Sequence, residues 1–126
     1  REAFVMYLKK GHEEEYERRH SEIWPELAAL LKESGVSEYS IFLEKETGKL
    51  FAFQHNTGQG SQDLGQNPIV QKWWAYMADI METNEDNSPI SIPLREVFYL
   101  HSELFIITKG FMDGMSETVK NEEDKM

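Results

Sequence analysis

Residues 2–8 read Glu-Ala-Phe-Val-Met-Tyr-Leu, and this short stretch decides the fold. Its aromatic, β-branched and other large apolar residues follow one another closely, which is typical of a β-strand. Because side chains alternate between the two faces of a strand, Phe4 and Met6 lie on one face, and Val5 and Tyr7 lie on the other. A sheet with water on one side alternates apolar and polar residues, so this strand predicts a sheet that is covered on both sides.

The chain after this strand alternates between helical and extended patterns. We expect one helix from His12 to about Arg19 and a second from Pro25 to Ser34, with a break between them because the residue before a proline disfavours the helical conformation. The other predicted elements are a second strand (37–44), a third strand (50–55), a third helix (68–81) and a fourth strand (95–100). The order βαββαβ predicts a ferredoxin-like α+β fold, in which two helices cover one face of an antiparallel four-stranded sheet.

The other face of this sheet needs a cover. The predicted strand 95–100 also has apolar residues on both faces, with Val97 on one and Phe98 on the other. A chain of 126 residues is the size of one domain, so a second domain is not available. We therefore expect a second copy of the chain, packed sheet to sheet as a dimeric α/β barrel. The domain would span residues 1–103, and residues 104–126 would be a C-terminal extension, either a strand or a disordered tail.

The charge of the chain limits its partners. There are 23 acidic and 13 Lys or Arg residues, a formal net charge of −10, and such a surface repels phosphate backbones and anionic lipid. We therefore expect neither nucleic acid nor a membrane as a partner, and we favour a neutral ligand. The chain has no cysteine, no apolar run of membrane-spanning length and no charged-then-apolar leader, which together predict a cytoplasmic location.

Tyr16 and His20 are the first candidates for chemistry. They are four residues apart on a predicted helix and therefore lie on the same face. The simpler interpretation of this spacing is an amphipathic stripe that faces the core. A buried polar pair must find hydrogen-bond partners, however, and a histidine gains or loses a proton near pH 7. His20 is thus the leading candidate for a general acid or base.

Trp73 and Trp74, followed by Tyr76, place three large aromatic rings within one helical turn. Neighbours on a helix differ in direction by about 100°, so we expect one tryptophan to pack in the core and the other to line a pocket or an interface. Aromatic rings with polar N–H and O–H groups suit a sugar, although a wedge in the core is an equally open interpretation. No compact set of His, Asp and Glu residues has the spacing of a metal site, and no phosphate-binding loop is present.

Several longer motifs resemble those of the L-rhamnose mutarotase family. They are the segment from Glu15 to His20 leading into Ile23-Trp24-Pro25-Glu26-Leu27, then Trp73-Trp74-Ala75-Tyr76-Met77, Asp86-Asn87-Ser88-Pro89 and Glu96-Val97-Phe98-Tyr99-Leu100. The resemblance runs from about residue 3 to about residue 100 and includes rare residues. It implies a dimeric, cofactor-independent isomerase that interconverts the α and β anomers of L-rhamnose.

The resemblance also implies roles for particular residues. His20 corresponds to the proton donor of the family, and Tyr16, Tyr39, Trp73 and Trp74 correspond to its substrate-binding residues. Ring opening needs a base that takes the anomeric O1 proton and an acid that protonates the ring oxygen. We expect His20 to be this acid, while the sequence does not identify the base. Neither step requires a metal, a nucleotide or a covalent intermediate.

The position of Tyr39 makes these expectations testable against a structure. Tyr39 can share a pocket with the helix residues only if it points to the helix-covered face of the sheet. By alternation, Ile41 and Leu43 would then face the helices, while Ser40 and Phe42 would face the partner subunit.

Two other functions fit the same predicted fold. One is a heme-degrading or small-molecule monooxygenase of the dimeric α/β barrel class, and the other is a non-catalytic sugar-binding barrel protein. A scaffold of this kind hosts unrelated functions, so only the site can separate them.

Overall fold

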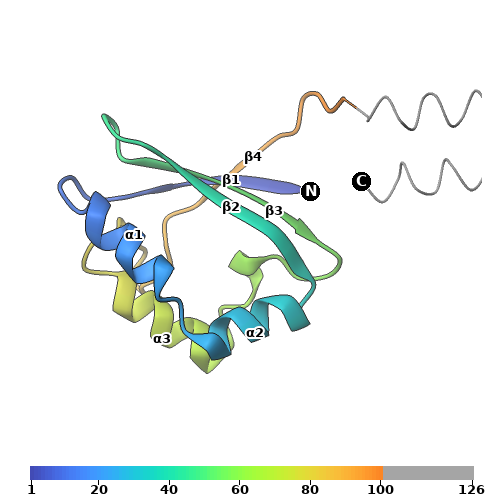
Figure 1. Ribbon diagram of the computed structural model, residues 1–126, viewed down its shortest axis with the longest axis horizontal. Coiled ribbons are helices and arrows are strands. Elements are labelled where there is room, and N and C mark those ends of the chain that lie inside the picture. Colours follow the sequence, from blue (N-terminus) through green and yellow to red (C-terminus); the bar gives the residue numbers. More distant parts are fainter. Residues whose placement is uncertain (101–126) are drawn as a thin grey trace, which may run out of the picture. The chain divides into compact units, whose positions relative to one another are not determined.

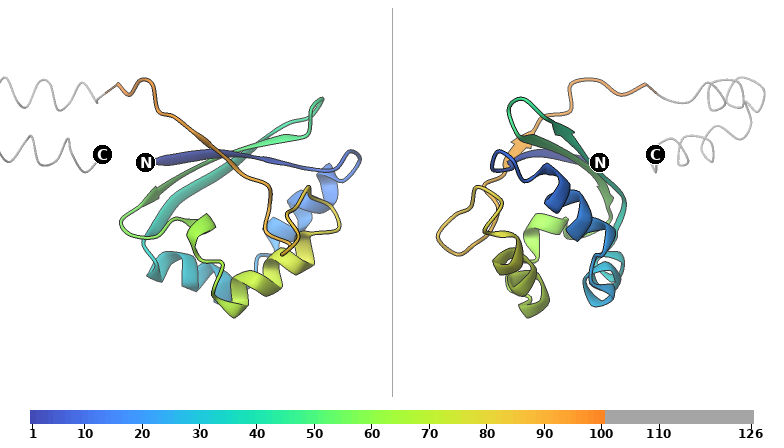
Figure 2. Two further views of the ribbon diagram at one scale, coloured as in Figure 1. Left: turned by 180° about the vertical axis from the view of Figure 1, so that it is seen from behind. Right: turned by 60° about the vertical axis from the view of Figure 1, so that its left-hand side comes forward.

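A computed structural model describes residues 1–100. Its elements, in chain order, are β1 (Glu2–Tyr7), α1 (Glu13–Ser21), α2 (Pro25–Glu33), β2 (Val36–Glu44), β3 (Lys49–Asn56), the 3₁₀ helix η1 (Ser61–Asp63), α3 (Pro68–Met77) and β4 (Ile92–Leu94). The strands form one antiparallel sheet in the order β2-β3-β1-β4, and all three α-helices lie on one side of it (Figures 1 and 2). The predicted α+β fold with its antiparallel four-stranded sheet is therefore confirmed.

The compact unit that carries these elements is Arg1–Arg95. The predicted domain limit at residue 103 and the predicted extension 104–126 lie outside the described residues. Among the helices of the described part, none combines the length and the apolar character that crossing a bilayer requires.

The break between α1 and α2 follows the local sequence. Trp24, which precedes Pro25, has an extended backbone with ψ of 129° and forms the N-cap of α2, so Pro25 occupies the first helical turn, where its missing N–H costs nothing. After α2, Gly35 takes a positive φ of 96°, and a Cβ atom there would lie 2.5 Å from the Thr57 hydroxyl oxygen. The predicted pair of helices, with its break at the proline and its stop at Gly35, is confirmed.

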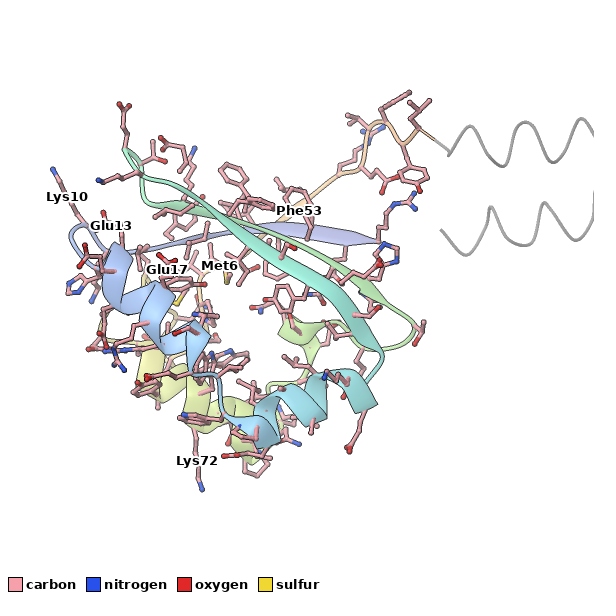
Figure 3. All side chains as sticks on the ribbon, in the orientation of Figure 1. Met6, Lys10, Glu13, Glu17, Phe53 and Lys72 are labelled. Atoms are coloured by element: carbon pink, nitrogen blue, oxygen red, sulfur yellow. The ribbon has the colours of Figure 1, made fainter. Side chains whose placement is uncertain are left out.

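The helix-facing side of the sheet forms the core. In the strand register, Phe4 of β1 stands opposite Ala52 of β3, which stands opposite Ile41 of β2. Met6 and Leu50 form the next row. Phe4, Met6, Leu50 and Ala52 are fully or almost fully buried, and the side chain of Met6 lies between the sheet and the helices (Figure 3). The apolar residues of this side pack against α1, α2 and α3 and fix where those helices lie.

The opposite side of the sheet is apolar but open. Phe42, Phe51 and Val5 form one row across β2, β3 and β1, and Phe53 lies on the same side in the next row (Figure 3). We define the outer sheet face as the residues Phe42, Phe51, Phe53, Ile92 and Leu94. The side chain of Phe42 is 60% exposed and that of Phe53 46%. Clustered exposed apolar side chains of this kind usually mark an interaction surface.

The fourth strand differs from its prediction at residues 95–100. The observed β4 contains Pro93, and Leu94 stands opposite Ala3 of β1. A proline can be accommodated because β4 is an edge strand, where one side of the backbone needs no partner. One residue further the register reaches Glu2, where β1 begins, so most of 95–100 has no part of β1 to pair with. The prediction was wrong because a proline within an apolar run was taken as a loop signal.

Candidate active site

The five residues singled out by sequence lie around one cavity between the helices and the sheet. Tyr16 and His20 reach it from α1, Tyr39 from β2, and Trp73 and Trp74 from α3. The cavity has a volume of about 70 Å³, and most of its remaining lining is apolar. The geometric prediction that Tyr39 shares a cavity with the helix residues is confirmed.

A wider groove between α1, α2 and β2 lies next to the cavity. This groove has a volume of about 1090 Å³ and shares Tyr16, His20 and Tyr39 with the cavity. Glu13 and Glu17 of α1 line the groove, and both are labelled in Figure 3. Acidic side chains repel anions, so this groove favours a neutral ligand.

His20 is held in a defined state. Its Nδ1 lies 3.0 Å from the carbonyl oxygen of Tyr16, one helical turn earlier. A carbonyl oxygen can only accept a hydrogen bond, so Nδ1 carries the proton and Nε2 of the neutral ring is left as an acceptor. Burial lowers the pKa of His20, and the hydrogen bond to the Tyr16 carbonyl opposes this only in part. At neutral pH the imidazole is therefore uncharged, with a basic nitrogen available.

Three cavity-lining residues have polar groups without a protein partner. Within residues 1–100, no protein group hydrogen-bonds the Tyr16 hydroxyl or the indole N–H groups of Trp73 and Trp74. Every fully buried side-chain polar atom in the described part has a hydrogen-bond partner, so these three groups are in contact with solvent. Burial raises the pKa of Tyr16, which keeps its hydroxyl protonated. Hydrogen-bonding groups in an otherwise apolar cavity suit a ligand with many hydroxyls.

Both tryptophans line the cavity, which corrects the expectation that only one of them does. Each is 9% exposed, and the Trp73 ring also meets His20 edge-on, with centroids 5.4 Å apart. The expectation considered only the directions of the Cβ atoms; an indole is large enough for two neighbouring residues to reach one space. A Cβ atom at Gly65 would lie 2.9 Å from the Trp74 ring, so the glycine leaves room for that ring.

Sequence reasoning missed three polar residues beside Tyr39. The Tyr39 hydroxyl lies 3.4 Å from the hydroxyl of Ser61, which is bonded in turn to Gln54 and Gln62. Ser61 and Gln62 line the cavity. Gln54 could have been found, because it is a polar residue at the same alternating position of β3 as the buried Ala52. Nothing in the sequence marks Ser61.

The position of α1 depends on Arg19, the neighbour of His20. Its buried guanidinium donates to Glu15 at 2.7 Å, to the backbone carbonyl of Tyr76 at 2.7 Å and to Asp79 at 2.8 Å. The same group lies 4.6 Å from the centre of the Tyr76 ring. Arg19 therefore ties α1 to the C-terminal end of α3 and sets the distance between the two helices that line the cavity.

We predict that this tie makes the fold sensitive to acid. Hydrogen bonds from Arg18 and Arg19 lower the pKa of Glu15 from 4.5 to about 2, and a hydrogen bond from Arg19 lowers the pKa of Asp79. A carboxylate with a lowered pKa stabilises the fold above its unfolded pKa and loses that contribution as pH falls through its folded pKa. The urea concentration at which half of the protein is unfolded should therefore decrease as the pH is lowered from about 4.5 to 2. This decrease should be less steep in Glu15→Gln. Equal slopes for the variant and the parent protein would contradict the prediction.

A partly buried neutral imidazole, two tyrosines and two tryptophans around one largely apolar cavity form a pocket that suits a sugar and can move protons. The fold and site thus describe a small α+β domain of the carbohydrate-converting class. The family model described as L-rhamnose mutarotase matches residues 1–100. The chain belongs to the L-rhamnose mutarotase family.

Individual relatives agree with this assignment. An L-rhamnose mutarotase of Bacteroides thetaiotaomicron is 68% identical over 101 residues, which cover 79% of this chain and 97% of the relative. One of Phocaeicola vulgatus is 61% identical over 101 residues, again 79% of this chain and 97% of the relative. The crystal structure of an L-rhamnose mutarotase from Formosa agariphila superposes with a TM-score of 0.74 at 58% identity, covering 79% of this chain and 96% of that one.

Proposed function

We propose that this protein is an isomerase that interconverts the α and β anomers of L-rhamnose. The observation that carries the proposal is the neutral His20 in a cavity with the hydroxyls of Tyr16 and Tyr39. Anomer exchange moves protons only, and this group of residues can accept and donate them. The membership of the chain in the L-rhamnose mutarotase family supports the choice of sugar.

The reaction follows from these groups. A proton leaves O1, another reaches the ring oxygen, and the bond between C1 and the ring oxygen breaks to give an open-chain aldehyde. Rotation about the C1–C2 bond presents the other face of the carbonyl. The reverse proton transfers then close the ring as the second anomer. Each positioned proton transfer contributes about 10²–10⁴-fold to a rate. His20 is the central acid/base group, and Tyr16 and Tyr39 hold hydroxyl groups of the sugar.

The apolar lining fits the 6-deoxy character of the substrate. L-rhamnose carries a methyl group where most hexoses carry a hydroxymethyl group. Trp73, Trp74 and apolar side chains such as Ile23 and Leu27 line the cavity. They provide contacts for this methyl group and for the C–H groups of the ring.

The test is saturation-transfer NMR of the anomeric protons of L-rhamnose, with and without the protein. The proposal expects the exchange between the two anomeric signals to accelerate in proportion to protein concentration. Sugar binding without acceleration would instead support a non-catalytic binding protein. A Soret shift on addition of hemin, without accelerated exchange, would support a monooxygenase.

We also propose that the protein is a homodimer that buries its outer sheet face. Phe42 and Phe53, with ring centres 5.9 Å apart, form an apolar patch on the side without helices. A second copy would cover this patch with the same residues, as a two-fold symmetric interface requires. A cytoplasmic location and the absence of nucleic-acid and membrane partners remain predictions of the sequence.

We predict that Phe42→Glu disrupts the dimer. An obligate interface buries more than about 2,000 Å² in total and is largely apolar, so a carboxylate placed within it would lose its hydration among apolar side chains. Sedimentation should show a dimer for the parent protein and mostly monomer for Phe42→Glu at micromolar concentration. Lys72→Glu is the control, because Lys72 is exposed on α3 and points away from the sheet (Figure 3). A parent protein that sediments as a monomer would refute the proposal.

A further inference from the structure

Gln54 is a polar side chain in the core, and both ends of its amide are used. It is 1% exposed and lies on the helix-facing side of β3. Its Oε1 accepts the backbone N–H of Ser61 at 2.8 Å, and its Nε2 donates to the Ser61 hydroxyl at 2.8 Å. A buried amide with two well-formed bonds to one residue holds that residue in a fixed place.

These contacts also fix the direction of the hydrogen bonds. A backbone N–H can only donate, so the oxygen of the Gln54 amide must face the Ser61 backbone, and its NH₂ group must face the Ser61 hydroxyl. The NH₂ group of Gln62 is a second donor toward this hydroxyl, at 3.4 Å. The Ser61 oxygen therefore accepts from two amides, and its own proton is left for another acceptor.

That acceptor is Tyr39. The Ser61 hydroxyl lies 3.4 Å from the Tyr39 hydroxyl and donates to it. Within the described residues, the Tyr39 hydroxyl has no other hydrogen-bond partner, so its own proton is free to point into the cavity. Burial raises the pKa of Tyr39, which keeps that proton in place at neutral pH. The backbone of Ser61 thus determines, through two side chains, that Tyr39 donates to the cavity.

We infer that Gln54 and Ser61 are positioning residues that make Tyr39 a hydrogen-bond donor to the ring oxygen of the sugar, in the cavity that Tyr39 shares with His20. This inference rests on the proposed mutarotation and deepens it. As the bond from C1 to the ring oxygen breaks, negative charge develops on that oxygen, and a hydrogen bond from Tyr39 stabilises it, while His20 remains the central acid/base group.

The test is a double-mutant cycle with Ser61→Ala and Tyr39→Phe, followed by NMR measurement of kcat and KM for L-rhamnose. Loss of one hydrogen bond should lower kcat of Ser61→Ala about fivefold to tenfold with KM changed less than about twofold. In the Tyr39→Phe background the same Ser61→Ala change should have no further effect, because residues that act through one another are not additive. Ser61→Thr, which retains a hydroxyl, should restore most of the rate. The control is Ser34→Ala at the end of α2, which should leave the rate unchanged.

A second variant, Gln54→Glu, tests the direction of the bonds. An ionised carboxylate cannot donate, so the Ser61 hydroxyl would turn toward it and Tyr39 would lose its incoming bond. The ratio of variant to parent rate should therefore be near one at low pH, where the new carboxyl group is protonated, and should fall several-fold as pH rises. If the Ser61→Ala variant does not fold, Gln54→Glu takes its place in the double-mutant cycle.

The outcomes separate this inference from the proposed function. A parent protein that fails to accelerate anomer exchange would overturn the proposed function. A parent protein that does so, with Ser61→Ala either at the parent rate or equally impaired with and without Tyr39, would overturn the positioning role alone. A rate ratio for Gln54→Glu that does not depend on pH would also overturn it.

Discussion

Replacement of His20 by glutamine is expected to lower the acceleration of anomer exchange by about 10²–10⁴-fold, the usual contribution of a positioned acid or base. Glutamine is similar in size and can still donate to the Tyr16 carbonyl, but its amide does not gain or lose a proton in the neutral range. The fold should be retained, as judged by an unchanged urea midpoint. A folded variant that exchanges anomers at the parent rate would show that His20 is not the acid/base group.

The pH dependence of the parent protein should agree with this role. Burial lowers the pKa of His20 from 6.5, so the neutral, proton-accepting form dominates at pH 7. The value of kcat/KM should therefore be constant near neutrality and fall as pH drops through that lowered pKa. If kcat/KM instead rose toward low pH, the protonated form of His20 would be the active form and would act as the acid. His55→Gln is a matched control, because His55 is near the surface and pairs with Glu38 at 3.3 Å.

Replacement of Trp73 by alanine is expected to lower the free energy of unfolding by about 3–5 kcal/mol, the usual cost of removing a large aromatic side chain from a core. The Trp73 ring is buried and contacts three others, with centroids 5.4 Å from His20, 5.1 Å from Trp24 and 5.6 Å from Tyr76. Its loss also removes an indole from the cavity and the edge contact that orients the imidazole. Both the stability and the rate should therefore fall.

The matched control for Trp73 is Trp24→Ala. The Trp24 ring belongs to the same aromatic cluster and packs on Trp73 and Tyr76, but Trp24 is partly buried and does not line the cavity. Its removal should cost less stability and affect the anomer exchange less at temperatures where the protein is folded. Urea unfolding and NMR exchange rates would measure the two effects separately. Equal losses of rate in both variants would mean that the tryptophans matter only for folding.

The local parts of the fold could be predicted from sequence because their causes are local. Pro25 ends one helical segment and begins the next, since proline restricts the residue before it and fits the first helical turn. The hairpin between β2 and β3 turns at Gly48, which has a positive φ of 74°. The alternation in residues 2–8 correctly separated the core face from the outer face of the sheet. In contrast, β4 was misplaced because only its edge position makes Pro93 acceptable in a strand.

The candidate site was found by residue type and motif, yet its arrangement depends on contacts between distant parts of the chain. The sequence by itself determined that Tyr16 and His20 share a helix face, because that follows from a helical repeat. Only the tertiary structure brings Ser61 to Tyr39, 22 residues away, and Arg19 to Asp79, 60 residues away. Such contacts are set by how helices pack on a sheet, and no periodic pattern in the sequence encodes the distance between two side chains on different elements. The state of each polar group, whether donor or acceptor, follows from those contacts and was therefore decided by the fold.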